Sequence, residues 1–300
     1  MERITKLIAT RYQEQVKSYQ TPHTMIPSSF TYQKVNSVEE ALTALATADA
    51  KFLAGGHSLI PTMKLRLSQP SKLVDIASIS SLRGIKESGS EIVIGAATTH
   101  QEVASNKIIQ NKLGIFAQGA SSIGDIQVRN KGTIGGSLAH ADPAADWPAV
   151  VLAADATIGV QSKKGSRTIK ATEFFKGIFA TALKEDEIIT SIHIPAPAGS
   201  KGVYLKFAQP ASRYAMVGCA VMKFADGKVN IAFTGVSSCA FRDTAAEKAI
   251  SGKKLDTATI EAAAKAAAEG MTILSDHYAS EKYRKHLAKV FLKRALKALA

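Results

Sequence analysis

Cysteine is nearly absent from this chain of 300 residues, which contains only two. A cysteine-ligated iron–sulfur cluster needs more thiolates than that, so such a cluster within the chain is excluded. Cys219 and Cys239 both lie in apolar, strand-like segments, which favours two buried free thiols over a disulfide. The seven histidines show no H-E-x-x-H or comparable spacing, so the sequence predicts no metal site.

Long apolar runs are missing as well. No uninterrupted stretch approaches the roughly 20 residues that a transmembrane helix requires. Residues 1–24 lack the contiguous apolar core and the small-residue cleavage site of a secretory signal. We therefore expect an amphipathic or disordered N-terminal extension and a cytoplasmic protein. With 46% hydrophobic and 21% charged residues, the composition is that of a globular protein of one large or two modest domains.

Acidic residues are scarce relative to basic ones, and the net charge is +13. Such a charge raises the hypothesis of a nucleic-acid-binding protein. Much of the excess lies in a predicted C-terminal helix, 278–299, which also carries apolar residues for packing, and no zinc-finger or recognition-helix pattern accompanies it. We favour a docking surface for an acidic partner subunit and expect no nucleic-acid partner, keeping nucleic-acid binding as the non-enzymatic alternative.

The chain also lacks the usual signatures of catalytic side chains. We find no nucleophile–base pair, no carboxylate dyad and no G-x-G-x-x-G motif after a strand. This absence is typical of a protein whose bound cofactor carries the redox chemistry while the side chains bind and orient it.

Two double-glycine segments stand out instead. The first bend, residues 54–58 (Ala-Gly-Gly-His-Ser), follows a strand-like run and precedes a helical run. The second bend, residues 133–137 (Thr-Ile-Gly-Gly-Ser), precedes a predicted helix with Asp142 as N-cap and Pro143 in its first turn. Glycines allow a backbone to come close to a ligand, and successive N–H groups can hold a diphosphate. We predict that the bends converge on one dinucleotide and that their glycines leave room for its diphosphate.

The remaining pattern predicts alternating strands and helices, then a strand-rich and helix-rich C-terminal part. Helices are expected at 37–47, 59–67, 99–122, 244–250, 257–269 and 278–299, and strands at 51–54, 73–76, 91–94, 157–161, 167–170, 188–194, 203–207, 217–224 and 229–233. Asp226-Gly227 joins the last two strands and is a strong hairpin signal. Residues 195–200 are the best candidate for a linker.

The two bends, together with Asp142-Pro143 and Asp146, resemble the FAD-binding subunit of the molybdenum hydroxylases, a family that includes carbon monoxide dehydrogenase, xanthine dehydrogenase and aldehyde oxidoreductases. The resemblance runs from Met25 to the end of the chain. It implies an α+β protein with a vanillyl-alcohol-oxidase-type (PCMH-type) FAD-binding fold. The FAD-binding domain would span 25–199, with two α/β subdomains at about 25–80 and 81–199, and a C-terminal domain at 200–300 would hold a three-stranded antiparallel sheet and helices.

The resemblance also implies a set of cofactor-binding residues and no catalytic side chain. The set comprises Leu53, Ala54, Gly55, Gly56, His57, Ser58, Leu59, Ile123, Thr133, Ile134, Gly135, Gly136, Ser137, His140, Asp146, Leu183, Ile188, Lys206 and Tyr214. Within it, Asp146 would hydrogen-bond the cofactor, Lys206 would contact it and Tyr214 would lie by the isoalloxazine ring.

From the residues alone, these roles have ordinary alternatives. Asp146 fits a first helical turn, Lys206 an exposed strand and Tyr214 a buried structural position, and His57 suits a hydrogen bond that stabilises its own loop. Strand-core packing explains Leu183 and Ile188 equally well. Two departures from the family pattern are Ser137, in place of a frequent asparagine, and Arg213, where related sequences often have an acid. Because of Arg213, we do not assign to this chain the electron acceptor that the family prefers.

The function that the resemblance implies is electron transfer within a heteromeric molybdenum hydroxylase. A large subunit would carry a molybdopterin cytosine dinucleotide-type molybdenum cofactor, and a small subunit two [2Fe–2S] clusters, in a dimer of heterotrimers. FAD on this chain would pass the electrons to an external acceptor (NAD, quinone or a carrier protein), and peripheral membrane association through other components stays open. The competing enzyme hypothesis is a self-sufficient FAD oxidoreductase of the same fold. The substrate would be set by the large subunit.

Overall fold

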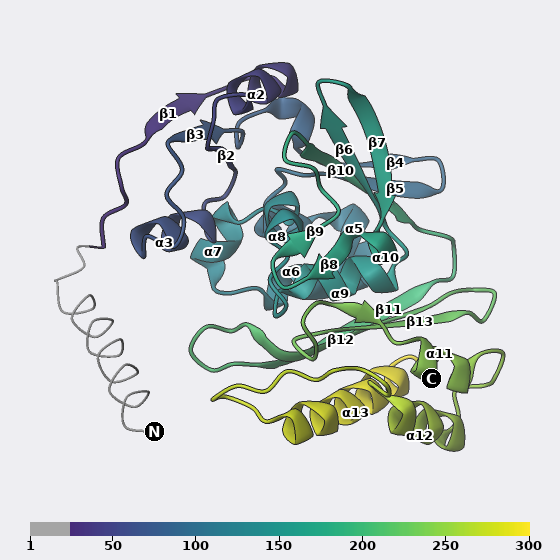
Figure 1. Ribbon diagram of the computed structural model, residues 1–300. Helices are drawn as coiled ribbons and strands as arrows, with labels where there is room; N and C mark the ends of the chain where they lie inside the picture. The colour runs from purple at the N-terminus through teal and green to yellow at the C-terminus, as the bar shows by residue number, and fades with distance from the viewer. Residues whose placement is uncertain (1–24) are drawn as a thin grey trace, which may run out of the picture.

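The computed structural model describes residues 25–300, so the predicted N-terminal extension 1–24 lies outside it. The described chain combines two sheets with central helices and, below them in Figure 1, a third sheet covered by C-terminal helices. Among residues 25–300, no helix is both long and apolar enough to cross a bilayer.

The first sheet contains three parallel strands in the order β1-β3-β2, namely β1 (Thr31–Lys34), β2 (Ala50–Leu53) and β3 (Lys72–Asp75). Strands β2 and β3 flank α3 (Leu59–Lys64), which confirms the predicted β-α-β unit, although the helix ends before Leu67. Helix α2 (Val38–Leu45) begins at the predicted cap, because Ser37 Oγ accepts from the Glu40 N–H. Strand β1 was not predicted, since all its residues are exposed and give no alternating pattern.

The second sheet has five antiparallel strands in the order β4-β5-β10-β6-β7. They are β4 (Ile85–Ser88), β5 (Glu91–Gly95), β6 (Thr157–Ser162), β7 (Gly165–Lys170) and β10 (Ile188–Pro195). A short 3-10 helix, η1 (Ser80–Leu82), precedes β4. The hairpin of β8 (Phe175–Gly177) and β9 (Ala180–Thr181) follows α10 (Ala171–Phe174).

The single helix predicted over 99–122 is three helices: α4 (His100–Ser105), α5 (Lys107–Lys112) and α6 (Gly114–Ser122). The expected capping box of Thr99 and Glu102 starts α4 and is fully formed. Asn106 then ends α4 and caps α5, because its side chain accepts from the backbone N–H groups of Ile108 and Ile109. The local hydrogen bonds of this asparagine therefore break the apolar periodicity that suggested one helix.

The second bend is not a loop. Gly135 and Gly136 lie in α8 (Ile134–His140), which follows α7 (Ile126–Lys131) and is capped by Thr133. The prediction that the next helix starts at Asp142 and Pro143 is also wrong, because α9 (Asp146–Ala153) begins at Asp146. Asp142 Oδ1 accepts from the Ala144 N–H at 2.8 Å, which makes a turn instead of a helix cap.

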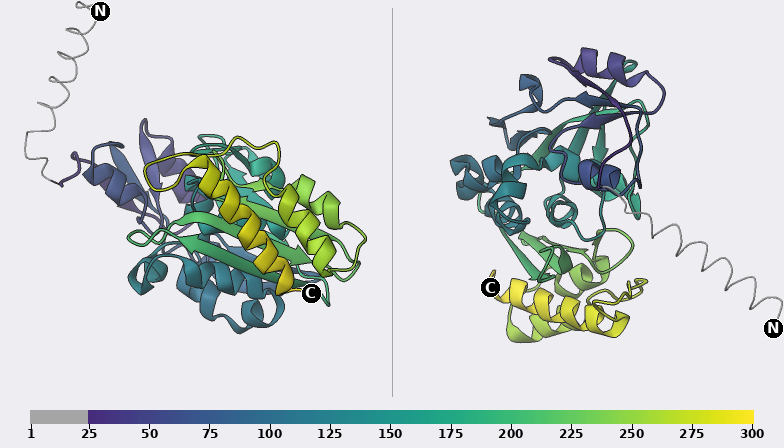
Figure 2. Two further views of the ribbon diagram at one scale, coloured as in Figure 1. Left: turned by 90° about the horizontal axis from the view of Figure 1, so that it is seen from below. Right: turned by 90° about the vertical axis from the view of Figure 1, so that its left-hand side faces the viewer.

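The C-terminal sheet has the order β11-β12-β13-β14, with β11 (Lys201–Ala208), β12 (Ala215–Lys223), β13 (Val229–Thr234) and β14 (Phe241–Arg242). The fourth strand corrects the three-stranded prediction, and it is only two residues long. The β12–β13 hairpin forms as predicted. Helices α11 (Thr244–Ile250), α12 (Thr257–Ala266) and α13 (Glu281–Lys297) follow, and α13 crosses one face of the sheet (Figure 2).

Alternation along the C-terminal strands divides their side chains between two cores. Cys219 and Val221 pack with Phe291 and Leu292 beneath the helices. Tyr204 and other residues of the opposite face join the largest core, which also contains the fully buried Trp147. The C-terminal sheet therefore packs directly against α6 and α9, the helices beside the second bend. Both cysteines are free, as predicted; Cys219 is buried, whereas Cys239 is only partly so.

Candidate functional site

The two bends meet in space. A Cβ atom built on Gly55 would lie 2.2 Å from the carbonyl oxygen of Lys131 and 2.7 Å from Cα of Gly132. On the other side, a Cβ on Gly136 would lie 3.9 Å from Cβ of Ala54. These contacts join segments about 80 residues apart in the sequence, and they confirm the prediction that the bends converge.

Gly55 serves this approach, and the other glycines of the bends allow close packing beside it, so they do not simply leave the space expected for a diphosphate. A Cβ on Gly135 would lie 2.6 Å from Cβ of Ala96, so this glycine lets α8 pack against the end of β5. Gly56 has φ +72, a left-handed conformation that other residues rarely adopt, and its Cβ would meet Ile60 and Leu53. The expectation that the missing side chains leave room for a ligand is therefore wrong: each would meet protein atoms.

A cavity of about 1040 Å³ opens beside the meeting point. Most of the predicted cofactor-binding residues line it: Ala54, Gly55, Gly56, His57, Ser58, Leu59, Ile123, Thr133, Gly135, Gly136, Ser137, His140, Asp146, Leu183, Ile188 and Tyr214. Three residues of the predicted set do not. Leu53 packs beneath the first bend, Ile134 is fully buried in the core, and Lys206 lies behind Asp146.

The first bend presents unused hydrogen-bond donors. Within residues 25–300, the backbone N–H groups of Gly55, Gly56, His57 and Ser58 donate to no protein acceptor. The ring of His57 braces the same bend, since its Nδ1 lies 3.1 Å from the carbonyl oxygen of Gly55. Successive N–H groups of this kind form a concave surface that suits an anion such as a diphosphate.

The second bend differs, because most of its N–H groups already donate within the protein. The N–H of Ile134 donates to the carbonyl of Thr98 at 3.1 Å, and that of Gly135 to Ala96 at 2.8 Å. The N–H of Gly136 donates to Thr133 Oγ1 at 3.1 Å. The second bend is therefore a packed wall of the cavity, and the first bend is its donor side.

Asp146 is the centre of a buried polar cluster. It is only 4% exposed, accepts from the Tyr204 hydroxyl at 2.5 Å, and pairs with the Lys206 ammonium at 2.9 Å. The same ammonium donates to the carbonyl of Ser122 at 2.8 Å. Lys206 is thus neither an exposed strand lysine nor part of the cavity wall: it fixes Asp146 from the C-terminal sheet.

Burial dominates the ionisation of this cluster. It raises the pKa of Asp146, against the opposing effect of the Lys206 ammonium. Burial and the nearby Asp146 carboxylate raise the pKa of Tyr204 well above its ordinary value, so the phenol stays protonated and donates. Tyr204 was not among the predicted residues, because a tyrosine in an apolar strand gives no local sign of a partner 58 residues away.

Tyr214 lies at the cavity in the loop between β11 and β12, and its 42% exposure excludes a buried structural role. Partial burial, together with the negative charges of Asp142 and Asp146, raises the pKa of Tyr214 to about 12. The side chain therefore offers the cavity a neutral ring and a hydroxyl.

An Arg–Glu pair holds the opposite wall. Arg167 Nε and Nη2 donate to the two carboxylate oxygens of Glu187 at 2.7 and 2.8 Å, in a bidentate arrangement. Arg167 Nη2 also donates to the carbonyl of Ala182 at 2.9 Å, and the Lys184 N–H donates to Glu187 at 2.9 Å. These bonds fix the turn that presents Leu183 to the cavity, and they lower the pKa of Glu187.

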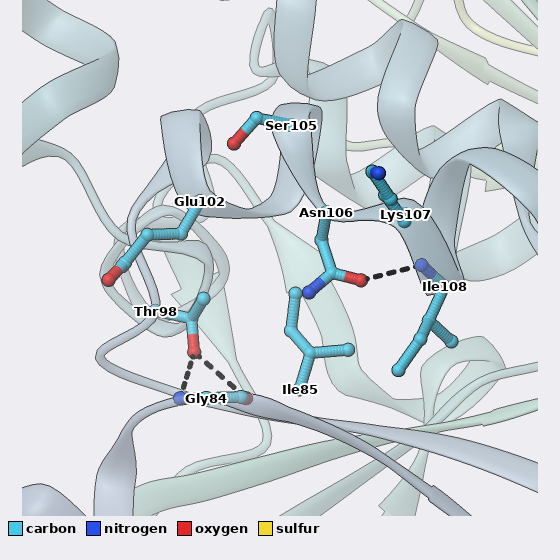
Figure 3. A pocket seen from close by; sticks show the side chains of 8 residues that line it. All are labelled: Gly84, Ile85, Thr98, Glu102, Ser105, Asn106, Lys107 and Ile108. Atoms are coloured by element: carbon cyan, nitrogen blue, oxygen red, sulfur yellow. Dashed lines mark hydrogen bonds between the residues drawn. The ribbon is translucent and has the colours of Figure 1, made fainter.

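A smaller pocket of about 540 Å³ lies between the start of β4, α4 and the start of α5 (Figure 3). Several of its polar groups are engaged with one another, since Thr98 Oγ1 bonds to both the N–H and the carbonyl of Gly84, and Asn106 Oδ1 accepts from the Ile108 N–H. It therefore offers less to a ligand than the large cavity does.

The fold and the large cavity together define the class of protein to which this chain belongs. Among residues 25–300, no group of three or more histidine, cysteine, aspartate or glutamate side chains could hold a metal ion. The large cavity instead combines apolar side chains with a bend whose N–H groups have no acceptor in the described part of the chain, which suits a large organic anion. The architecture is that of a cofactor-binding protein whose ligand supplies the chemistry.

Comparison with known families identifies this cofactor. Residues 28–197 match the FAD binding domain in molybdopterin dehydrogenase, and residues 203–299 match the CO dehydrogenase flavoprotein C-terminal domain. The chain therefore belongs to the FAD-binding medium subunits of the molybdenum hydroxylase family, and it is an oxidoreductase subunit.

Individual relatives cover nearly the whole chain. It is 40% identical over 281 residues to the carbon monoxide dehydrogenase medium chain of Hydrogenophaga pseudoflava, covering 91% of this chain and 98% of the relative. It is 38% identical to the glyceraldehyde dehydrogenase medium chain of Sulfolobus acidocaldarius, covering 92% and 100%. Among solved structures, carbon monoxide dehydrogenase from H. pseudoflava matches with a TM-score of 0.87 at 42% identity, covering 91% and 98%.

Proposed function

We propose that this chain binds one FAD in the large cavity and uses it to transfer electrons within a heteromeric molybdenum hydroxylase. The observation that carries the proposal is the first bend: four of its N–H groups have no acceptor within residues 25–300, and the same residues line a cavity of about 1040 Å³. This volume is at the upper end of the roughly 300–1,000 Å³ of small-molecule sites and suits a long dinucleotide.

When bound, FAD would supply the redox chemistry, and the chain's own residues would hold and shape it. The first bend, residues 54–58, would hold the diphosphate through its backbone donors. Leu183 and Ile188 would pack on apolar parts of the ligand, and Tyr214 would offer its ring and hydroxyl. Asp146, fixed by Lys206, would accept hydrogen bonds at the cavity wall.

We also propose the domain division at 25–199 and 200–300, with the first part divided near residue 80. One hydrophobic core, under α13, lies wholly within 200–300 and supports the second domain, whereas the core around Trp147 is shared with the C-terminal sheet. The family matches over 28–197 and 203–299 meet at the same point as the proposed linker.

The proposal includes partner subunits. The relatives are medium chains or named subunits of larger enzymes, and two cysteines are too few for an iron–sulfur cluster in this chain. Electrons would come from two [2Fe–2S] clusters on a small subunit, after substrate oxidation at a molybdopterin cytosine dinucleotide-type cofactor on a large one. A dimer of heterotrimers and a cytoplasmic location stay predictions. The family assignment favours this function over nucleic-acid binding, and medium subunits that cover 91–92% of the chain favour it over a self-sufficient oxidoreductase.

Native purification of the tagged chain from its own cells tests the proposal, with flavin, iron and molybdenum measured in the same fraction. We expect a yellow complex with FAD, iron and molybdenum in constant proportion. A flavin-containing chain that purifies alone would favour the self-sufficient oxidoreductase. A colourless chain with salt-dependent DNA binding would contradict both flavoprotein hypotheses.

A further inference from the structure

His100 is a buried side chain that the proposed binding residues do not include. It is the first residue of α4, is 5% exposed, and lines the large cavity. Its Nδ1 accepts a hydrogen bond from the indole N–H of the fully buried Trp147 at 3.0 Å. Because Nδ1 is the acceptor, a neutral ring carries its proton on Nε2.

The ring does stay neutral. Burial lowers the pKa of His100 to about 3, and electrostatic interaction with His57 and Arg129 acts in the same direction. At neutral pH the side chain therefore holds one N–H, on the side of the ring away from Trp147. Within residues 25–300, Nε2 makes no hydrogen bond to protein. Unlike Arg284 Nε, this nitrogen is not fully buried, so a ligand or water in the cavity can reach it and accept its hydrogen bond.

This donor lies where the two bends meet. A Cβ built on Gly132 would lie 2.6 Å from Nε2 of His100. A Cβ built on Gly55 would lie 2.7 Å from Cα of Gly132, so the His100 ring and the first bend lie on either side of this glycine. The His100 N–H also donates to the Gly132 carbonyl at 2.9 Å, so the backbones of α4 and the second bend are tied together here. Both His100 and Gly132 line the cavity next to the free N–H groups of the first bend.

We propose that His100 is a binding residue that donates a neutral hydrogen bond from Nε2 to a phosphate oxygen of the bound dinucleotide. Trp147 is its positioning residue, because the indole N–H selects the tautomer that donates. A neutral donor completes the diphosphate site without burying a further charge. The proposal rests on the proposed function, since it assumes that FAD occupies the cavity.

Two amide variants separate the two bonds of His100. In His100→Asn, the amide oxygen lies near the position of Nδ1 and can accept from the Trp147 indole N–H. The asparagine side chain is too short to place a donor at the position of Nε2. In His100→Gln, the longer side chain places its NH₂ group near the position of Nε2. This variant has no acceptor for the indole N–H of Trp147. We expect His100→Asn to lower the affinity of the full chain for FAD by about ten- to a hundredfold, the effect of a hydrogen bond to a charged group.

The expected results form a crossed pattern. His100→Asn binds FAD weakly at near-normal thermal stability, whereas His100→Gln binds FAD within a few-fold of wild type at lower stability. At saturating FAD, the ³¹P resonances of the bound diphosphate shift in His100→Asn and stay in place in His100→Gln. Wild-type affinity or unshifted ³¹P resonances in His100→Asn would overturn the proposal for His100. Failure of the wild-type chain to bind FAD would instead overturn the proposed function.

Discussion

Gly55→Ala is the sharpest perturbation of the meeting point between the bends. The added Cβ would lie 2.2 Å from the Lys131 carbonyl oxygen, whereas real Cβ contacts essentially never fall under 3.0 Å. The bends must therefore separate by at least about 0.8 Å, and all three obstructing atoms belong to the backbone, which cannot rotate away. Overpacking of this kind costs about 1–3 kcal/mol of folding free energy.

The same displacement moves the N–H groups of the first bend relative to the opposite cavity wall. We expect FAD affinity to fall at least about tenfold, equivalent to about 1.4 kcal/mol, measured by quenching of flavin fluorescence. Gly114→Ala is the matched control, because Gly114 lies in a helix and a Cβ added there would meet no atom of the described chain within 4 Å beyond its own helix. This control should bind FAD normally. Wild-type affinity in a folded Gly55→Ala chain would refute the reasoning.

Three further predictions concern buried groups. Lys206→Met leaves the Asp146 charge buried and unpaired, so urea unfolding should show a loss of about 3–5 kcal/mol, and the exposed Lys201→Met control almost none. Because the pKa of His100 is about 3 in the folded chain and near 6.5 when unfolded, the unfolded state binds an extra proton below pH 6.5. The free energy of unfolding should therefore fall by up to about 1.4 kcal/mol per pH unit between pH 6.5 and 3, and His100→Asn should remove that component. Burial raises the pKa of the Cys219 thiol well above its usual range, so maleimide should label it only after unfolding; rapid native labelling would contradict its burial.

Local patterns predicted much of this fold. Strands β5, β6 and β10 carry short apolar runs or alternating apolar residues, and the Asp226-Gly227 turn predicts the β12–β13 hairpin. Each of these elements is predicted by residues that lie within a few positions of one another in the sequence. The exposed strand β1 and the two-residue strand β14 carry no such signal, because their places depend on pairing with distant strands.

The second bend shows where local reasoning fails. A Gly-Gly pair disfavours a helix by propensity, so the sequence predicts a loop there. Tertiary contacts decide otherwise, because the Gly135 N–H donates to Ala96 and only a glycine can approach that strand so closely. The similarity of the two bends predicted that they meet. It did not predict that the first bend is the donor side of the cavity and the second a packed wall.

The buried partners of the site were equally hidden. Tyr204 and Asp146 are 58 residues apart, and His100 and Trp147 are 47 apart, so no spacing in the sequence pairs them. The capping box over Thr99 and Glu102 placed the start of α4 correctly, yet it gave no reason to assign His100 to the cavity. Such side chains become visible only when packing brings the elements together.

The most direct measurement of the central claim is a crystal structure of the chain with FAD bound. The dinucleotide should lie in the cavity between the bends, with its diphosphate accepting hydrogen bonds from the N–H groups of residues 55–58. FAD bound elsewhere, or in this cavity with its diphosphate away from the first bend, would contradict the claim.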